Sequence, residues 1–148
     1  MVWPAPIPHG RLPVRPTASA QEIPTLATLR DIHATWAWVV IIGNGLAGLW
    51  ALGAAKLPQL RTRALWWFTF FVELAVFVQV ALGVGMVAGQ KIKAPKFHMF
   101  YGFVAVVAVG IIYSYRQQLE GKLYWLYGGG GLFVMGLGIR ALLVAKAG

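Results

Sequence analysis

The stretch ATWAWVVIIGNGLAGLWALGAA, residues 34–55, decides the fold of this chain. It holds no charged side chain, and its length is close to the roughly 20 residues that a helix needs to cross the hydrocarbon core of a bilayer. Lipid offers the backbone no hydrogen-bond partners, so such a run is expected to form a helix that satisfies its own N–H and C=O groups. The stretch therefore predicts a transmembrane helix.

Three more apolar runs follow, at residues 64–88, 98–115 and 123–144. The second run carries a single charged residue, Glu73, and the fourth carries Arg140. Short polar connections join the runs, which is typical of helices that pack antiparallel to their neighbours. The sequence predicts an all-α integral membrane protein, a four-transmembrane-helix up-down bundle with both termini on the same side of the membrane.

The composition excludes an ordinary soluble fold. Hydrophobic residues make up 59 % of the 148 residues and charged residues 11 %, whereas soluble domains carry about 25 % charged residues. The net charge of +9 comes from bases that lie mostly between the apolar runs, where they meet lipid phosphates and set the topology. The expected partners are the lipid bilayer and other membrane protein subunits, and no nucleic acid.

The placement of the bases also bears on orientation. Near the helix ends, six bases lie on the side of the termini and five on the opposite side. By this margin the positive-inside rule places the termini in the cytoplasm, and the plasma membrane of a bacterium is the expected location. The chain has no Cys, which excludes disulfides and thiolate metal sites, and no metal site is expected.

Residues 1–27 differ from the rest of the chain, the bundle of residues 28–148. They contain six of the eight prolines, which oppose a regular helix. The sequence therefore predicts a Pro-rich extended or disordered N-terminal tail. The alternative is an extended strap on a partner subunit, with Trp3, Ile7 and Val14 as its apolar anchors.

Glycines recur within the predicted spans. Residues 43–48, GNGLAG, match the dinucleotide-binding pattern GxGxxG, but that motif must follow a strand and open a helix. Inside a transmembrane helix, small residues instead let helix backbones approach closely. We expect such packing here and at Gly85 and Gly89, and a bend or close contact at residues 128–131.

Two histidines occupy matching places, because His33 directly precedes the first run and His98 opens the third, and these two runs point in the same direction. Each is followed one turn later by a small residue, Ala37 or Gly102. Two inward histidines on different helices suit the axial ligands of a b-type haem, with Arg140 near the propionates. The alternative is that both imidazoles are interfacial or hydrogen-bonding groups without a cofactor.

Glu73 is the one acid within the predicted spans, and Asn44 is expected at a comparable depth on the first helix. Hydrocarbon disfavours the charged form of a carboxyl group, so Glu73 is a candidate for proton or cation coupling together with Asn44. The alternative is a protonated or hydrogen-bonded Glu73 that holds helices together, with Asn44 or Tyr113 as its partner. Gln79 lies on another face of the same helix, about 120° away. If one of these two residues faces the bundle interior, the other is a candidate for contact with a partner chain.

The segments RDIH (residues 30–33), FHMFYGF (97–103) and IIYSYR (111–116) resemble those of small four-helix membrane proteins common in actinobacteria, over residues 28–145. The resemblance implies the fold and carries no function. Paired-carboxylate and Ser/His/acid arrangements are missing, so enzymatic activity is not expected. The sequence favours a non-catalytic accessory subunit of a larger membrane complex, respiratory in kind. Its alternatives are a single b-haem electron carrier and a small proton-coupled transporter that uses Glu73.

Overall fold

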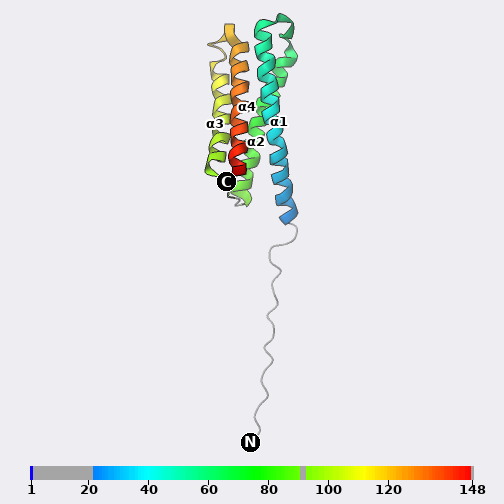
Figure 1. The fold of residues 1–148 in the computed structure, drawn as a ribbon, viewed down its shortest axis with the longest axis vertical. Helices are drawn as coiled ribbons and strands as arrows, with labels where there is room; N and C mark the ends of the chain where they lie inside the picture. Colours follow the sequence, from blue (N-terminus) through cyan, green and yellow to red (C-terminus); the bar gives the residue numbers. More distant parts are fainter. Residues whose placement is uncertain (2–21, 91–92, 148) are drawn as a thin grey trace.

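The computed structural model describes residue 1 and residues 22–90 and 93–147. Four long helices run antiparallel to their neighbours in sequence (Figure 1). Their bounds are α1 Glu22–Lys56, α2 Arg63–Gln90, α3 Lys96–Tyr115 and α4 Leu123–Ala147, with the short 3-10 helices η1 Pro58–Leu60 and η2 Glu120–Lys122 in two of the connections. All four helices are long and apolar enough to cross a membrane. The predicted all-α transmembrane bundle is confirmed.

The first helix begins earlier than the predicted span. α1 starts at Glu22, inside the stretch expected to be an extended tail, and it includes Pro24. A proline is tolerated there because the first-turn N–H groups of a helix have no intrahelical partner. Residues 2–21, with the strap proposed at Trp3, Ile7 and Val14, lie outside the described residues.

The closest packing in the bundle joins α1 to α4, and glycines make it possible. A Cβ atom on Gly48 would lie 2.9 Å from the carbonyl oxygen of Gly128, and a Cβ on Gly131 would lie 2.9 Å from the carbonyl oxygen of Asn44. These contacts are to backbone atoms, which cannot turn aside as a side chain can. The close packing expected of residues 43–48 and 128–131 is therefore confirmed, and α4 continues through its glycines as one helix.

The same expectation is wrong for Gly85 and Gly89. Within the described part of the chain, no atom lies within 4 Å of a Cβ placed on either residue. Both are exposed on the last turns of α2, where no other described helix approaches them. Spacing alone does not distinguish a glycine pair on a packed face from one on an open face.

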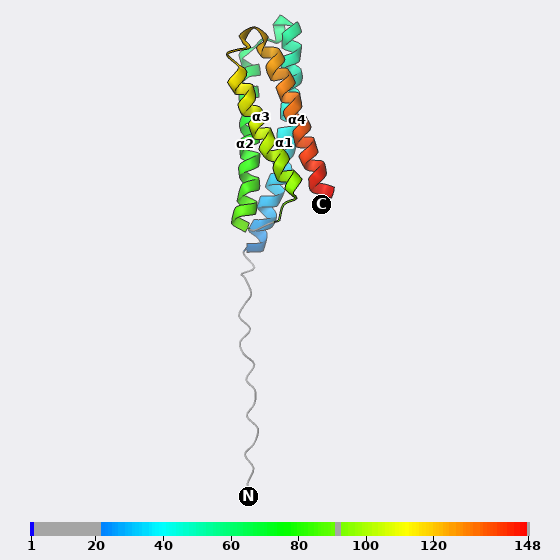
Figure 2. The same cartoon turned by 90° about the vertical axis from the view of Figure 1, so that its left-hand side faces the viewer.

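The pairs of helices in the bundle do not pack equally closely. α1 packs extensively against α4 and α2, and α3 packs against α4, whereas α2 and α3 make far fewer contacts with each other. In the view of Figure 2, α2 runs nearly vertically, whereas α3 runs obliquely across it. The α2–α3 seam is therefore the loosest junction between consecutive helices.

The connection from α1 to α2 is fixed by side chains that cap both helix ends. The Arg61 guanidinium donates to the carbonyl oxygens of Ala54, at 2.8 Å, and Ala55, at 3.3 Å, in the last turn of α1. The Thr62 hydroxyl oxygen accepts a hydrogen bond of 3.3 Å from the backbone N–H of Leu65 in the first turn of α2. Such caps satisfy backbone groups that the helices themselves leave open.

We expect Arg61→Gln to lower the free energy of unfolding by about 1–2 kcal/mol, because hydrogen bonds from a charged donor to these carbonyls are lost. Arg63→Gln is the matched control, since Arg63 lies at the same end and makes no hydrogen bond or ion pair with the described residues. Thermal unfolding of both variants in detergent, followed by circular dichroism, measures the difference. Equal stability of the two variants would contradict the capping role.

Candidate functional site

Polar side chains inside the bundle form two groups. The first, here called the histidine cluster, consists of His33 on α1, Gln79 on α2 and His98 on α3, near the end where α1 begins and α4 ends. The second surrounds Glu73 on α2, toward the opposite end. Each group joins residues that lie far apart in the sequence.

The histidine cluster brings the two predicted haem ligands into contact. The ring centroids of His33 and His98 lie 6.0 Å apart, and the ring planes are inclined by 69°. The two side chains come from parallel helices that are separated by α2 in the sequence. The structure thus places at one point the two histidines that were expected only at similar depth.

His98 is held in one orientation by α4. Its Nδ1–H donates a hydrogen bond of 3.0 Å to the carbonyl oxygen of Ala141, and because a carbonyl only accepts, the proton must be on Nδ1. The lone pair is then on Nε2. Histidines that bind metals commonly donate their other ring N–H to a backbone carbonyl in this way.

His33 is held by α2. The amide nitrogen of Gln79 lies 3.3 Å from His33 Nε2 and donates to the carbonyl oxygen of His33 at 3.1 Å. An amide nitrogen only donates, so Nε2 accepts and Nδ1 carries the proton. The ring also lies against Gly83, where a Cβ atom would come within 3.2 Å of His33 Cε1. A larger residue at position 83 would therefore displace the imidazole.

Two polar atoms of this cluster are buried without a hydrogen-bond partner in the described part of the chain, His33 Nδ1 and Gln79 Oε1. Buried polar atoms in folded proteins nearly always have a partner, and exceptions call for an explanation such as a ligand or an ordered water. The histidine cluster therefore has unused hydrogen-bonding or ligating capacity.

Arg140 lies next to this cluster, on the outer surface. It is exposed, and its Nε donates to the hydroxyl oxygen of Tyr101 at 3.4 Å. Its neighbour in sequence, Ala141, is the residue whose carbonyl holds His98. Arg140 thus supplies a positive charge at this end of the bundle, as expected for a residue that faces an acidic group or a lipid phosphate.

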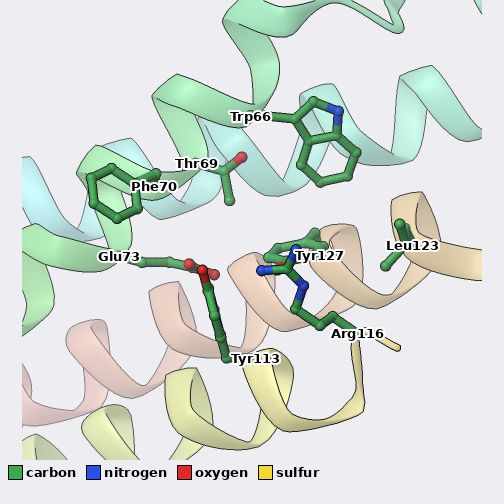
Figure 3. Close-up of a pocket in the computed structure, with 8 residues that line it drawn as sticks. All are labelled: Trp66, Thr69, Phe70, Glu73, Tyr113, Arg116, Leu123 and Tyr127. Carbon is green, nitrogen blue, oxygen red and sulfur yellow. The ribbon is translucent and has the colours of Figure 1, made fainter. Parts of the chain in front are cut away.

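Glu73 faces a partly open cavity of about 350 Å³ between α2, α3 and α4 (Figure 3). The carboxylate is on a residue only 8 % exposed, and it makes no hydrogen bond or ion pair with any described residue. The cavity is lined by Trp66, Thr69, Phe70, Glu73, Tyr113, Arg116, Leu123 and Tyr127. We refer to it as the Glu73 cavity.

Asn44 does not join Glu73. It is buried, but its side-chain amide donates to the carbonyl oxygen of Val40, one turn earlier on α1, at 2.8 Å. It is also not among the residues that line the Glu73 cavity. The two residues proposed to act together in proton or cation coupling therefore belong to different places in the bundle.

Gln79 is a member of the site that the sequence did not connect to the histidines. Only one of Gln79 and Glu73 was expected to face the bundle interior, whereas Glu73 lines a cavity between helices and the amide of Gln79 bonds to His33. A signal was present in the sequence, because Gln79 and Gly83 are one turn apart on α2 and together form a small polar face. Comparisons with protein families, curated proteins and solved structures gave no match for this chain.

Proposed function

We propose that the chain is a single-haem, b-type electron carrier of a bacterial plasma membrane, with His33 and His98 as the axial ligands. The observation that carries the proposal is the 6.0 Å separation of the two imidazole centroids. Two histidines on different helices would hold a b-type haem between them, and here their imidazoles meet at one point in the bundle.

The chemistry of the surrounding residues also fits. A porphyrin supplies the other four nitrogens to iron, so two imidazoles complete the ligand set. His98 already has its tautomer fixed by the Ala141 carbonyl, which leaves the lone pair on Nε2, and the tautomer of His33 likewise places the lone pair on Nε2. For His33 Nε2 to act as the ligand, the Gln79 amide must leave it while keeping its bond to the His33 carbonyl.

Haem would supply one-electron transfer within the membrane, and the residues of the chain would bind and orient it. The Ala141 carbonyl would hold the His98 imidazole in one orientation with its proton on Nδ1, and Gln79 and Gly83 would position His33. Arg140 is exposed at the same end of the bundle, where its charge would offset that of the propionates. The apolar helices would limit access of water.

This proposal departs from the function that the sequence favoured, a non-catalytic accessory subunit. That expectation rested on the lack of catalytic groups, on polar residues lying on more than one helix face, and on the Pro-rich tail. The two polar residues of α2 both face other parts of the same chain, because Gln79 bonds to His33 in the histidine cluster and Glu73 lines the Glu73 cavity. Polar residues on two faces therefore do not require a partner chain.

The test is a visible spectrum of the full chain, purified in mild detergent from haem-replete bacterial cells. We expect a sharp b-type α band in the reduced-minus-oxidised spectrum, with haem stoichiometric to the chain. A flat spectrum from such cells would overturn the proposal. The search would then turn to the membrane complex that co-purifies with the chain.

A further inference from the structure

The Glu73 cavity contains more polar groups than helix packing requires. Besides the carboxylate of Glu73, the Thr69 hydroxyl is buried without a hydrogen-bond partner in the described part of the chain, and the hydroxyls of Tyr113 and Tyr127 lie around the same space. Figure 3 shows the side chains of Glu73 and Tyr113 directed toward each other across the gap between α2 and α3. Such unpartnered groups around a cavity point to a bound polar molecule.

The charges in the cavity balance. Glu73 brings one negative charge when its carboxyl group is ionised and Arg116 brings one positive charge, and no other titrating acid or base lines the cavity apart from the two tyrosines. The two charged groups are not paired with each other at salt-bridge distance, since Glu73 has no ion pair with a described residue. A ligand that satisfies both would carry a positive and a negative group at once.

The hydrogen-bonding groups that line the cavity indicate which kind of positive group a ligand would carry. The carboxylate of Glu73 and the hydroxyl oxygens of Thr69, Tyr113 and Tyr127 can all accept hydrogen bonds. A primary ammonium, with three N–H donors, matches these acceptors better than a quaternary ammonium, which has none. The guanidinium of Arg116 is suited to a phosphate or carboxylate oxygen.

The position of the cavity indicates where such a molecule would come from. Arg116 follows the last residue of α3, at the end of the bundle that also carries the connections η1 and η2. Arg116 is exposed, whereas Glu73 lies deeper, about 15 Å along α2 from Arg63, at about 1.5 Å per residue. The lining residues come from both sides of the loose α2–α3 seam. A lipid headgroup that enters at Arg116 would extend inward along this seam to reach Glu73.

We propose that the Glu73 cavity binds the headgroup of an aminophospholipid, with its primary ammonium at Glu73 and its phosphate at Arg116. The cavity volume of about 350 Å³ lies at the small end of the range for ligand pockets, about 300–1,000 Å³, which suits a headgroup. The proposal is independent of haem binding at the histidine cluster, which lies toward the other end of α2.

Native mass spectrometry of the full chain in detergent tests the proposal. The probe is an equimolar mixture of phosphatidylethanolamine and phosphatidylglycerol with identical acyl chains, and phosphatidylcholine replaces the first lipid in a second series. We expect one molecule of phosphatidylethanolamine to be retained at least about tenfold more than either other lipid, since charge-assisted hydrogen bonds are worth about 1.5–3 kcal/mol each. Equal retention of the three lipids would overturn the proposal.

Four variants locate the binding. Glu73→Gln and Arg116→Gln should each reduce the preference for phosphatidylethanolamine about tenfold or more. The matched controls are Glu120→Gln and Arg63→Gln, which remove the same charges at the same end outside the cavity lining. If Glu73→Gln does not fold, Arg116→Gln still tests the proposal, because Arg116 is exposed and its replacement should leave the fold intact. A preference unchanged in Arg116→Gln would overturn the proposal.

A competition separates a lipid from a soluble molecule of the same chemistry. Free glycerophosphoethanolamine carries the same ammonium and phosphate groups without acyl chains. We expect it to displace phosphatidylethanolamine only at concentrations at least about a hundredfold higher, because burial of acyl chains against the helices adds to the affinity of the lipid. Displacement at equal concentration would assign the cavity to a soluble zwitterion and overturn the lipid assignment.

Discussion

His33→Ala and His98→Ala should each abolish the α band of bound haem, because each removes one of the two axial ligands that the histidine cluster offers. The third histidine, His9, provides the control, since His9→Ala removes the same side chain outside the apolar runs. The measurement is the reduced-minus-oxidised spectrum and the haem content per chain for all three variants, with helix content checked by circular dichroism. Full haem content in either His33→Ala or His98→Ala would contradict the assignment.

A rescue experiment separates loss of a ligand from loss of the fold. His98→Ala leaves a space beside the Ala141 carbonyl that held the imidazole N–H. Free imidazole in the buffer should occupy that space, donate to the same carbonyl and restore the band at millimolar concentration. No recovery at any imidazole concentration, in a variant with full helix content, would indicate that His98 does not act as a ligand.

Gly131→Val should destabilise the bundle by about 3 kcal/mol, at the upper end of the usual cost of overpacking. A Cβ at position 131 would already lie 2.9 Å from the Asn44 carbonyl oxygen and 3.0 Å from Gly48 Cα. Both atoms belong to the backbone of α1, so α1 and α4 must move apart. Thermal unfolding in detergent measures the loss.

The control for this prediction is Gly129→Val, two residues earlier on the same helix. No described atom lies within 4 Å of a Cβ at position 129, and the change of helix propensity is the same in both variants. A difference in melting temperature between the two variants therefore reports contact with α1 alone. Equal melting temperatures would show that the close α1–α4 approach is absent in the folded protein.

The fold could be predicted from hydropathy because the bilayer imposes both the length and the helical form of each span. Hydropathy predicted the ends of the helices less well. α1 extends back to Glu22, well before the predicted first residue of the span at position 34, since a helix can continue beyond the hydrocarbon where its residues are polar. Hydropathy reports only the part of a helix that lies in lipid.

The depth of the site residues in the membrane could be predicted from the sequence, but their contacts with residues of other helices could not. Helix periodicity placed His33 and His98 at similar depth and facing inward, and Tyr113, one of the partners proposed for Glu73, does line its cavity. The sequence did not give Gln79 as the partner of His33 or Tyr127 as a neighbour of Glu73. Those contacts depend on how far each helix is rotated about its axis, which packing determines.

The glycine contacts between α1 and α4 also bear on how the chain is made. The most extensive packing among the described helices joins the first helix to the last. Synthesis proceeds from the N-terminus at about 5–20 residues per second, so the glycine face of α1 enters the membrane before its partner exists. That face must remain against lipid, or against the insertion machinery, until α4 has followed. Assembly of the bundle is therefore completed only when the last helix arrives.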